Sequence, residues 1–178
     1  MVFVLEGAPM ITADVVALAL TVVFGGAMVV VVVWDIATYE IPDTLSLMLV
    51  LVGSAALLAG QGWGGLGTHV LGALGAFAFG VVMFALGQWG GGDVKFLAAT
   101  ALWLSGPVLF GYILWVTIIG GGLALVVLVF RRFRLPECLA ARPWLARLHQ
   151  ADEGLPYGVA LGIGGLVMLR PAVITVMG

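Results

Sequence analysis

The stretch Trp89-Gly90-Gly91-Gly92-Asp93-Val94-Lys95-Phe96-Leu97 places a carboxylate and an ammonium in a chain that is otherwise almost entirely hydrocarbon. Of its 178 residues, 63% are hydrophobic and only 9% are charged. A soluble domain of this size cannot bury so much apolar surface, so the composition predicts an all-α, polytopic membrane protein. An acid beside a bilayer is costly unless it is paired or hydrated, and it therefore marks a functional site by default.

Apolar runs of about 17–25 residues predict about six membrane-spanning helices within one domain that covers residues 1–178. The predicted spans are 12–34, 45–59, 66–86, 96–105, 108–130 and 155–177. The fourth is short unless Gly92–Lys95 already belong to it. In the third, Gly72, Ala76 and Gly80 recur every four residues, which predicts a seam of small residues for close helix packing. The start lacks the positive region of a signal peptide, so the first span is expected to be retained.

The basic residues predict the orientation. Five of the seven Lys and Arg residues lie in a loop of about residues 131–153, Lys95 follows the third span, and Arg170 lies near the end of the sixth. Because cytoplasmic loops carry an excess of Lys and Arg, we expect the loop, Asp35 and Asp93 on the cytoplasmic side of the inner membrane and both termini outside. Two acids far apart in sequence are thus expected at one depth on one face.

Two neighbouring carboxylates share a proton, because both cannot ionise easily. Such a pair can act as base toward a water and as acid toward a leaving amine, as in aspartic proteases, without a metal or another cofactor. The residues alone leave two other readings open, in which the acids cap or anchor helices, or relay protons or ions. The single cysteine, Cys138, excludes an internal disulfide and a multi-cysteine zinc site. No basic patch interleaves with aromatic residues, so nucleic acid is not an expected partner.

Three segments resemble the type IV prepilin peptidases. Gly90-Gly91-Gly92-Asp93 fits the G-x-G-D signature of membrane aspartyl proteases, and its continuation to Ala99 is similar to the G-x-G-D-x-K-(L/F)-L-A-A run of that family. Asp35, followed by Ile41-Pro42, resembles the family's first motif, an aspartate a few residues before Ile-Pro-Asn. Pro156-Tyr157-Gly158 resembles the Pro-Tyr-Gly element that opens the last helix. The short form that serves tight-adherence (Flp-type) pili is the most similar, with archaeal preflagellin peptidases as relatives.

The resemblance implies that Asp35 and Asp93 are the catalytic pair of an endopeptidase. The family cleaves the short basic leader of prepilins at the cytoplasmic membrane face, just before the hydrophobic stalk, and needs no metal for it. Gly90 and Gly92 would let the loop bring Asp93 beside Asp35. Long members carry a further cytoplasmic segment with cysteine pairs and methylate the new N-terminus. This chain lacks that segment, so no methyltransferase activity is expected. The expected partners are the prepilin and membrane lipids, and the oligomeric state does not follow from the sequence.

The acids around this site depart from the family pattern. Asp43 stands where the family usually has Asn, and Glu40 where a basic residue is common. We hypothesise that these two acids, with Asp152 and Glu153, form an acidic rim that attracts the basic leader. The alternative is that all four are solvated interfacial acids. Pro42 suits a loop or a first helical turn, with Asp43 or Thr44 as an early polar partner for free N–H groups of the next helix.

Several other polar and aromatic side chains have positions that the sequence predicts. Lys95 is expected to snorkel to the interface, to bind lipid phosphate or to stabilise an ionised Asp93. His69 is expected at the interface, and the six Trp residues mostly in an aromatic belt near span ends. Residues 143–148 are compatible with a short interfacial helix.

Three other functions are the rivals of a prepilin peptidase. They are a presenilin-like intramembrane protease, a proton-coupled transporter and a structural subunit of a pilus assembly.

Overall fold

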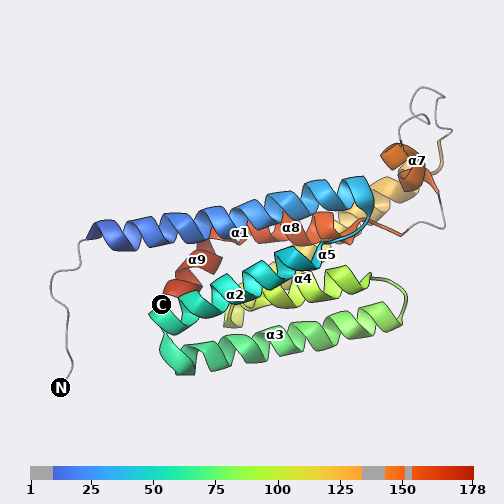
Figure 1. Ribbon diagram of the computed structural model, residues 1–178. Coiled ribbons are helices and arrows are strands. Elements are labelled where there is room, and N and C mark those ends of the chain that lie inside the picture. The colour runs from blue at the N-terminus through green and yellow to red at the C-terminus, as the bar shows by residue number, and fades with distance from the viewer. Residues whose placement is uncertain (1–9, 134–142, 151–153) are drawn as a thin grey trace, which may run out of the picture.

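The structure is a computed structural model that describes residues 10–133, 143–150 and 154–178. The described residues form helices without strands, which confirms the predicted fold class. The helices are α1 (Met10–Thr38), α2 (Asp43–Gly60), α3 (Gly62–Ala85), α4 (Gly91–Ala101), α5 (Gly106–Phe130), α7 (Pro143–His149), α8 (Tyr157–Val167) and α9 (Leu169–Met177) (Figure 1). Part of the predicted cytoplasmic loop, with Asp152 and Glu153, lies outside the described residues.

Four of these helices, α1, α2, α3 and α5, are long and apolar enough to cross a membrane. Helices α8 and α9 meet at an angle of 64° and add a fifth crossing if the bent pair is one span. The described residues therefore form a polytopic membrane protein with fewer full-length spans than the predicted six. The difference is α4, whose 11 residues rise only about 16 Å, about half of the hydrocarbon thickness.

Two buried side chains hold the chain that follows α4. His69 Nδ1 is 2.8 Å from the Leu102 carbonyl oxygen, and the Trp103 indole N–H donates to the Leu49 carbonyl oxygen at 2.9 Å. His69 is 1% exposed and Trp103 is fully buried. The predictions of an interfacial His69 and a belt position for Trp103 are therefore wrong. A Cβ on Gly53 would lie 2.6 Å from the indole nitrogen, so glycine makes room for the ring.

The small-residue seam of α3 is confirmed. A Cβ on Gly80 would lie 2.9 Å from Val94 Cγ1, and one on Gly72 would lie 3.0 Å from Leu109 Cδ2. Both distances are shorter than ordinary van der Waals contact, so a side chain at either position requires the facing Val94 or Leu109 to move. The seam lets α4 pack deeply between its neighbours, and it positions the N-terminus of α4 at one end of the bundle.

That end of the bundle gathers several segments that are distant in sequence. The junctions that follow α1 and α3, the C-terminal end of α5, and α7 all lie there, whereas α9 and the junction between α2 and α3 lie toward the other end (Figure 1). This is the grouping that the basic residues predicted. Which side of the membrane the end faces stays a prediction. The predicted short helix at 143–148 is confirmed as α7.

Candidate active site

Asp35 lies in the last turns of α1, because the helix continues to Thr38. The predicted spans 12–34 and 45–59 left residues 35–44 between helices, but residues 35–38 belong to α1 and residues 43–44 to α2. The carboxylate is 3% exposed, and its Oδ2 accepts a hydrogen bond of 3.2 Å from the backbone N–H of Val159. Val159 is in the first turn of α8, where free N–H groups and the helix dipole favour a negative charge. Asp35 thus binds the start of a helix more than a hundred residues away.

Glycine at position 158 is a requirement of this contact. A Cβ added there would lie 2.8 Å from three atoms of Asp35, namely Cβ, Cγ and Oδ2. Pro156 is buried and caps the N-terminus of α8, and Tyr157 is the first helical residue. The predicted Pro156-Tyr157-Gly158 element therefore acts on Asp35 directly, through close backbone approach.

Asp93 lies in the first turn of α4, a position that the sequence prediction left open. Its Oδ2 accepts a 2.8 Å hydrogen bond from the backbone N–H of Gly90, which is one half of a capping box. Asp93 is 8% exposed, and α4 is not among the candidate spans. Burial raises the pKa of the Asp93 carboxyl above its usual range, and the Gly90 hydrogen bond partly offsets the rise.

The two acids line one pocket of about 510 Å³. Its other lining residues come from the junctions that follow α1 and α3 and from the first turns of α2 and α4, namely Tyr39, Glu40, Ile41, Pro42, Asp43, Gly90, Gly91 and Gly92. The carboxyls of Asp35 and Asp93 are close enough for their charges to interact. The fold thus brings together most of the predicted site residues. Lys95, Pro156, Tyr157 and Gly158 lie around this acidic pocket without lining it.

Lys95 pairs with Asp43, which lines the acidic pocket. Its ammonium donates to both carboxylate oxygens of Asp43 at 2.8 Å. Asp43 therefore does not cap α2, which begins after Pro42 with no side-chain cap. A partner on Asp43 was not among the predictions for Lys95. Both side chains are more than half exposed, so the pair is worth about 0–1 kcal/mol. It neutralises part of the predicted acidic rim and leaves the exposed Glu40 as a charge at the pocket.

The three glycines before Asp93 differ in what they do. A Cβ on Gly92 would lie 3.1–3.4 Å from the Cβ, carbonyl oxygen and nitrogen of Ile41, so Gly92 permits close approach of the two junctions. Nothing lies within 4 Å of the corresponding position on Gly91. Gly90 has an extended backbone that any residue adopts, with φ −80° and ψ 159°. The close approach implied for Gly90 and Gly92 is therefore seen at Gly92 alone.

A family model described as type IV leader peptidase matches residues 22–125, more than half of the chain. The chain belongs to the type IV leader peptidase family. The matched segment contains both acids of the pocket and the glycines before Asp93. Comparisons with curated proteins and with solved structures found no match. Membership implies a peptidase that acts on a prepilin-type substrate.

The leader peptidase has a feature in this pocket that the sequence did not reveal. Tyr39 adopts the left-handed conformation, with φ 59°, and its N–H donates to the Asp35 carbonyl oxygen at 2.8 Å. Positive φ is uncommon for a bulky residue. It ends α1 sharply and turns the chain so that residues 40–43 line the pocket. Tyr carries no preference for this conformation, so no sequence signal pointed to it.

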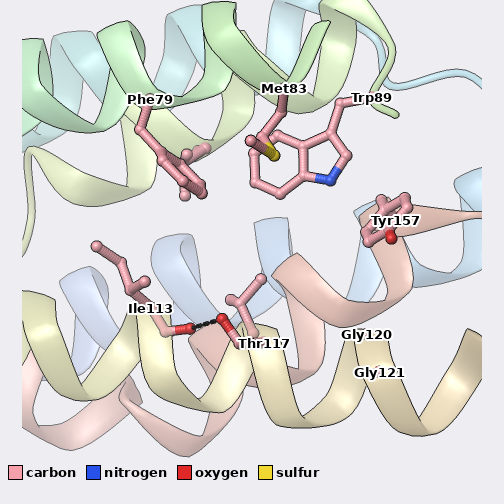
Figure 2. A pocket seen from close by; sticks show the side chains of 10 residues that line it. Phe79, Met83, Trp89, Ile113, Thr117, Gly120, Gly121 and Tyr157 are labelled. Carbon is pink, nitrogen blue, oxygen red and sulfur yellow. Dashed lines mark hydrogen bonds between the residues drawn. The ribbon is translucent and has the colours of Figure 1, made fainter. Parts of the chain in front are cut away.

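A second pocket of about 270 Å³ lies between α3 and α5 (Figure 2). Phe79 and Met83 line one side of it, and Ile113 and Thr117 lie opposite them. The ring of Trp89 lies 5.7 Å from that of Tyr157, measured between centroids, at the end of the pocket. Trp89 directly precedes Gly90, and Tyr157 directly precedes Gly158. This ring contact therefore links the backbone segments that hold the two acids.

Proposed function

We propose that this leader peptidase is an aspartic endopeptidase in which Asp35 and Asp93 form the catalytic pair. The observation that carries the proposal is the shared pocket, in which two buried carboxyls from distant helices interact. Two buried acids that form no ion pair with a described Lys or Arg are costly, and a fold retains such an arrangement where function needs it. Lys95, the nearest basic residue in sequence, is bound by Asp43 and not by either acid.

The pair would hydrolyse the peptide bond with one shared proton. The ionised carboxylate takes a proton from a water molecule, whose oxygen attacks the scissile carbonyl carbon. The protonated partner donates its proton to the carbonyl oxygen, and the tetrahedral intermediate then breaks its C–N bond as a proton passes to the leaving amine. Burial of Asp93, which raises its pKa, favours the singly protonated pair that this cycle requires.

The proposed substrate is a prepilin of the Flp type, cleaved at the cytoplasmic face after its short basic leader. The acidic pocket is compatible with a basic leader, because Glu40 is exposed on its lining. Lys95, Arg131 and Arg147 lie in or beside the segments gathered at this end of the bundle (Figure 1), as expected of a cytoplasmic end. We further propose that the product's new N-terminus stays unmethylated.

The test is expression of the chain with a tagged Flp-type prepilin, comparing the wild type with Asp35→Asn and Asp93→Asn. Asp14→Asn is the matched control, because it makes the same change on an exposed position near the other end of α1. Cleavage should persist in the control and in the presence of a chelator, and should be lost in either pocket variant. Cleavage that survives both pocket changes would refute the proposed pair. Mass spectrometry of the product tests for methylation.

A further inference from the structure

An apolar groove of about 710 Å³ lies between α2 and α3. Helix α4 contributes its floor through small residues such as Ala98 and Ala99. Its walls carry large hydrophobic side chains that are 37–58% exposed, among them Leu47, Leu74 and Phe77. On α2 the lining runs from Asp43 to Ser54, which at 1.5 Å per residue is a length of about 16 Å.

This groove leads to the acidic pocket by two routes. It shares Asp43 with that pocket. It also shares Phe77 and Lys95 with a small apolar pocket of about 180 Å³, which in turn shares Gly91 with the acidic pocket. The pocket of Figure 2 has no lining residue in common with the acidic pocket. The groove between α2 and α3 is thus the apolar surface most directly continuous with the two acids.

We propose that this groove binds the apolar segment that follows the cleavage site of the substrate. The inference rests on the proposed function, because a substrate cut at Asp35 and Asp93 must place its basic and apolar parts on different sides of the scissile bond. Glu40 lies on the acidic pocket, and the apolar lining begins at Gly91 and Asp43. A chain that passes over Gly91 meets open space there, because nothing lies within 4 Å of where its Cβ would be.

A buried hydroxyl supports a peptide as the occupant. Ser46 lines the groove one turn from Asp43 and is 7% exposed. Its Oγ has no hydrogen-bond partner among the described residues. A buried polar atom is normally satisfied, and a peptide offers carbonyl groups or polar side chains that can accept from this hydroxyl, whereas an acyl chain offers none. Helix association in lipid depends on close packing, which the small residues of the α4 floor permit.

The experiment uses the full chain in membranes with a tagged Flp-type prepilin, in an Asp93→Asn background that preserves the substrate. The photo-cross-linking residue p-benzoylphenylalanine replaces either Phe77, which lines the groove, or Phe79, which lines the pocket of Figure 2. The two rings are on the same helix and are 44% and 45% exposed, so size, depth and exposure are matched. Leu128, which is 58% exposed on α5 and lines neither the groove nor the pocket of Figure 2, is a third position.

We expect a prepilin adduct at position 77 and none at positions 79 and 128. The adduct at position 77 should disappear when the apolar segment of the prepilin is made polar. Lipid adducts alone at position 77, or an equal or stronger prepilin adduct at 79, would overturn the inference. Cleavage is measured in parallel with Asp93 intact. If cleavage occurs without an adduct at position 77, binding in the groove is refuted and the proposed function stands. If the unsubstituted protein does not cleave the prepilin, both proposals are refuted.

Discussion

Substitution of Gly158 by alanine tests how closely the fold positions Asp35. The added Cβ would lie 2.8 Å from Cβ, Cγ and Oδ2 of Asp35, whereas carbon atoms in optimal contact lie about 3.5–4.0 Å apart. The two helices must therefore separate by about 0.7 Å or more. A shift of about 1 Å in a catalytic group costs about 10²-fold in rate, so we expect kcat for prepilin cleavage to fall by about two orders of magnitude.

Stability should move less than activity. Overpacking costs about 1–3 kcal/mol, and part of this is offset because alanine is favoured over glycine in a helix by about 1 kcal/mol. Gly154→Ala is the matched control, because nothing lies within 4 Å of its Cβ position shortly before α8. Initial rates of leader removal in detergent, together with thermal unfolding, separate the two effects. A Gly158→Ala enzyme with wild-type kcat would refute the argument that close approach positions Asp35.

Three further predictions concern the acidic pocket. Gly92→Ala should lower both kcat and the unfolding temperature, because its Cβ would lie 3.1 Å from Ile41 Cβ. Gly91→Ala should leave the unfolding temperature unchanged, because nothing lies within 4 Å of its Cβ position. Equal changes in the unfolding temperature of the two variants would contradict this contrast. Glu40→Lys should raise KM for a basic leader with little change in kcat, and an unchanged KM in a folded protein would remove Glu40 from leader binding. Because burial raises the pKa of Asp93, the folded state keeps a proton that the unfolded state releases, so stability should decrease as pH rises from the usual carboxyl range through the raised pKa. Thermal unfolding against pH should show a smaller slope for Asp93→Asn, and an identical slope would argue against this titration.

The apolar runs predicted most helices but not where they end. Asp35 is polar and was assigned to a junction, yet α1 continues through it to Thr38. The free energy of burying a carboxylate in a helix is small when the N-terminus of another helix donates a hydrogen bond to it. For Asp35 that donor is the N–H of Val159, which the sequence around Asp35 does not indicate. Similarly, hydropathy read residues 96–105 as a span, although α4 owes much of its apolar character to burial among α2, α3 and α8.

Tertiary partners explain the other differences. Lys95 was expected to reach lipid, water or Asp93, and its carboxylate partner Asp43 is 52 residues away in the sequence. His69 and Trp103 were assigned to interfaces because each has a polar atom, but backbone carbonyls satisfy those atoms inside the bundle. Polar groups mark places that need a partner, and only the fold shows whether the partner is water, lipid or protein.

The glycine pattern was informative about location rather than mechanism. The run of three glycines identified the segment before Asp93, but Gly92 alone makes a close contact, and Gly91 faces open space. Gly158, predicted only through the resemblance of its segment, makes a tighter approach to an acid than any of the three. The resemblance thus found the right segments, and the distances show that Gly158 makes room for Asp35 whereas Gly92 makes room for Ile41.

The central claim, that Asp35 and Asp93 act as one catalytic unit, is tested most directly by the kcat values of Asp35→Asn, Asp93→Asn and the double variant on the same prepilin. Residues that act as a unit are strongly non-additive. The account predicts that each single change abolishes cleavage to the level of the double variant. Independent, multiplicative losses, or a single variant that retains substantial activity, would contradict it.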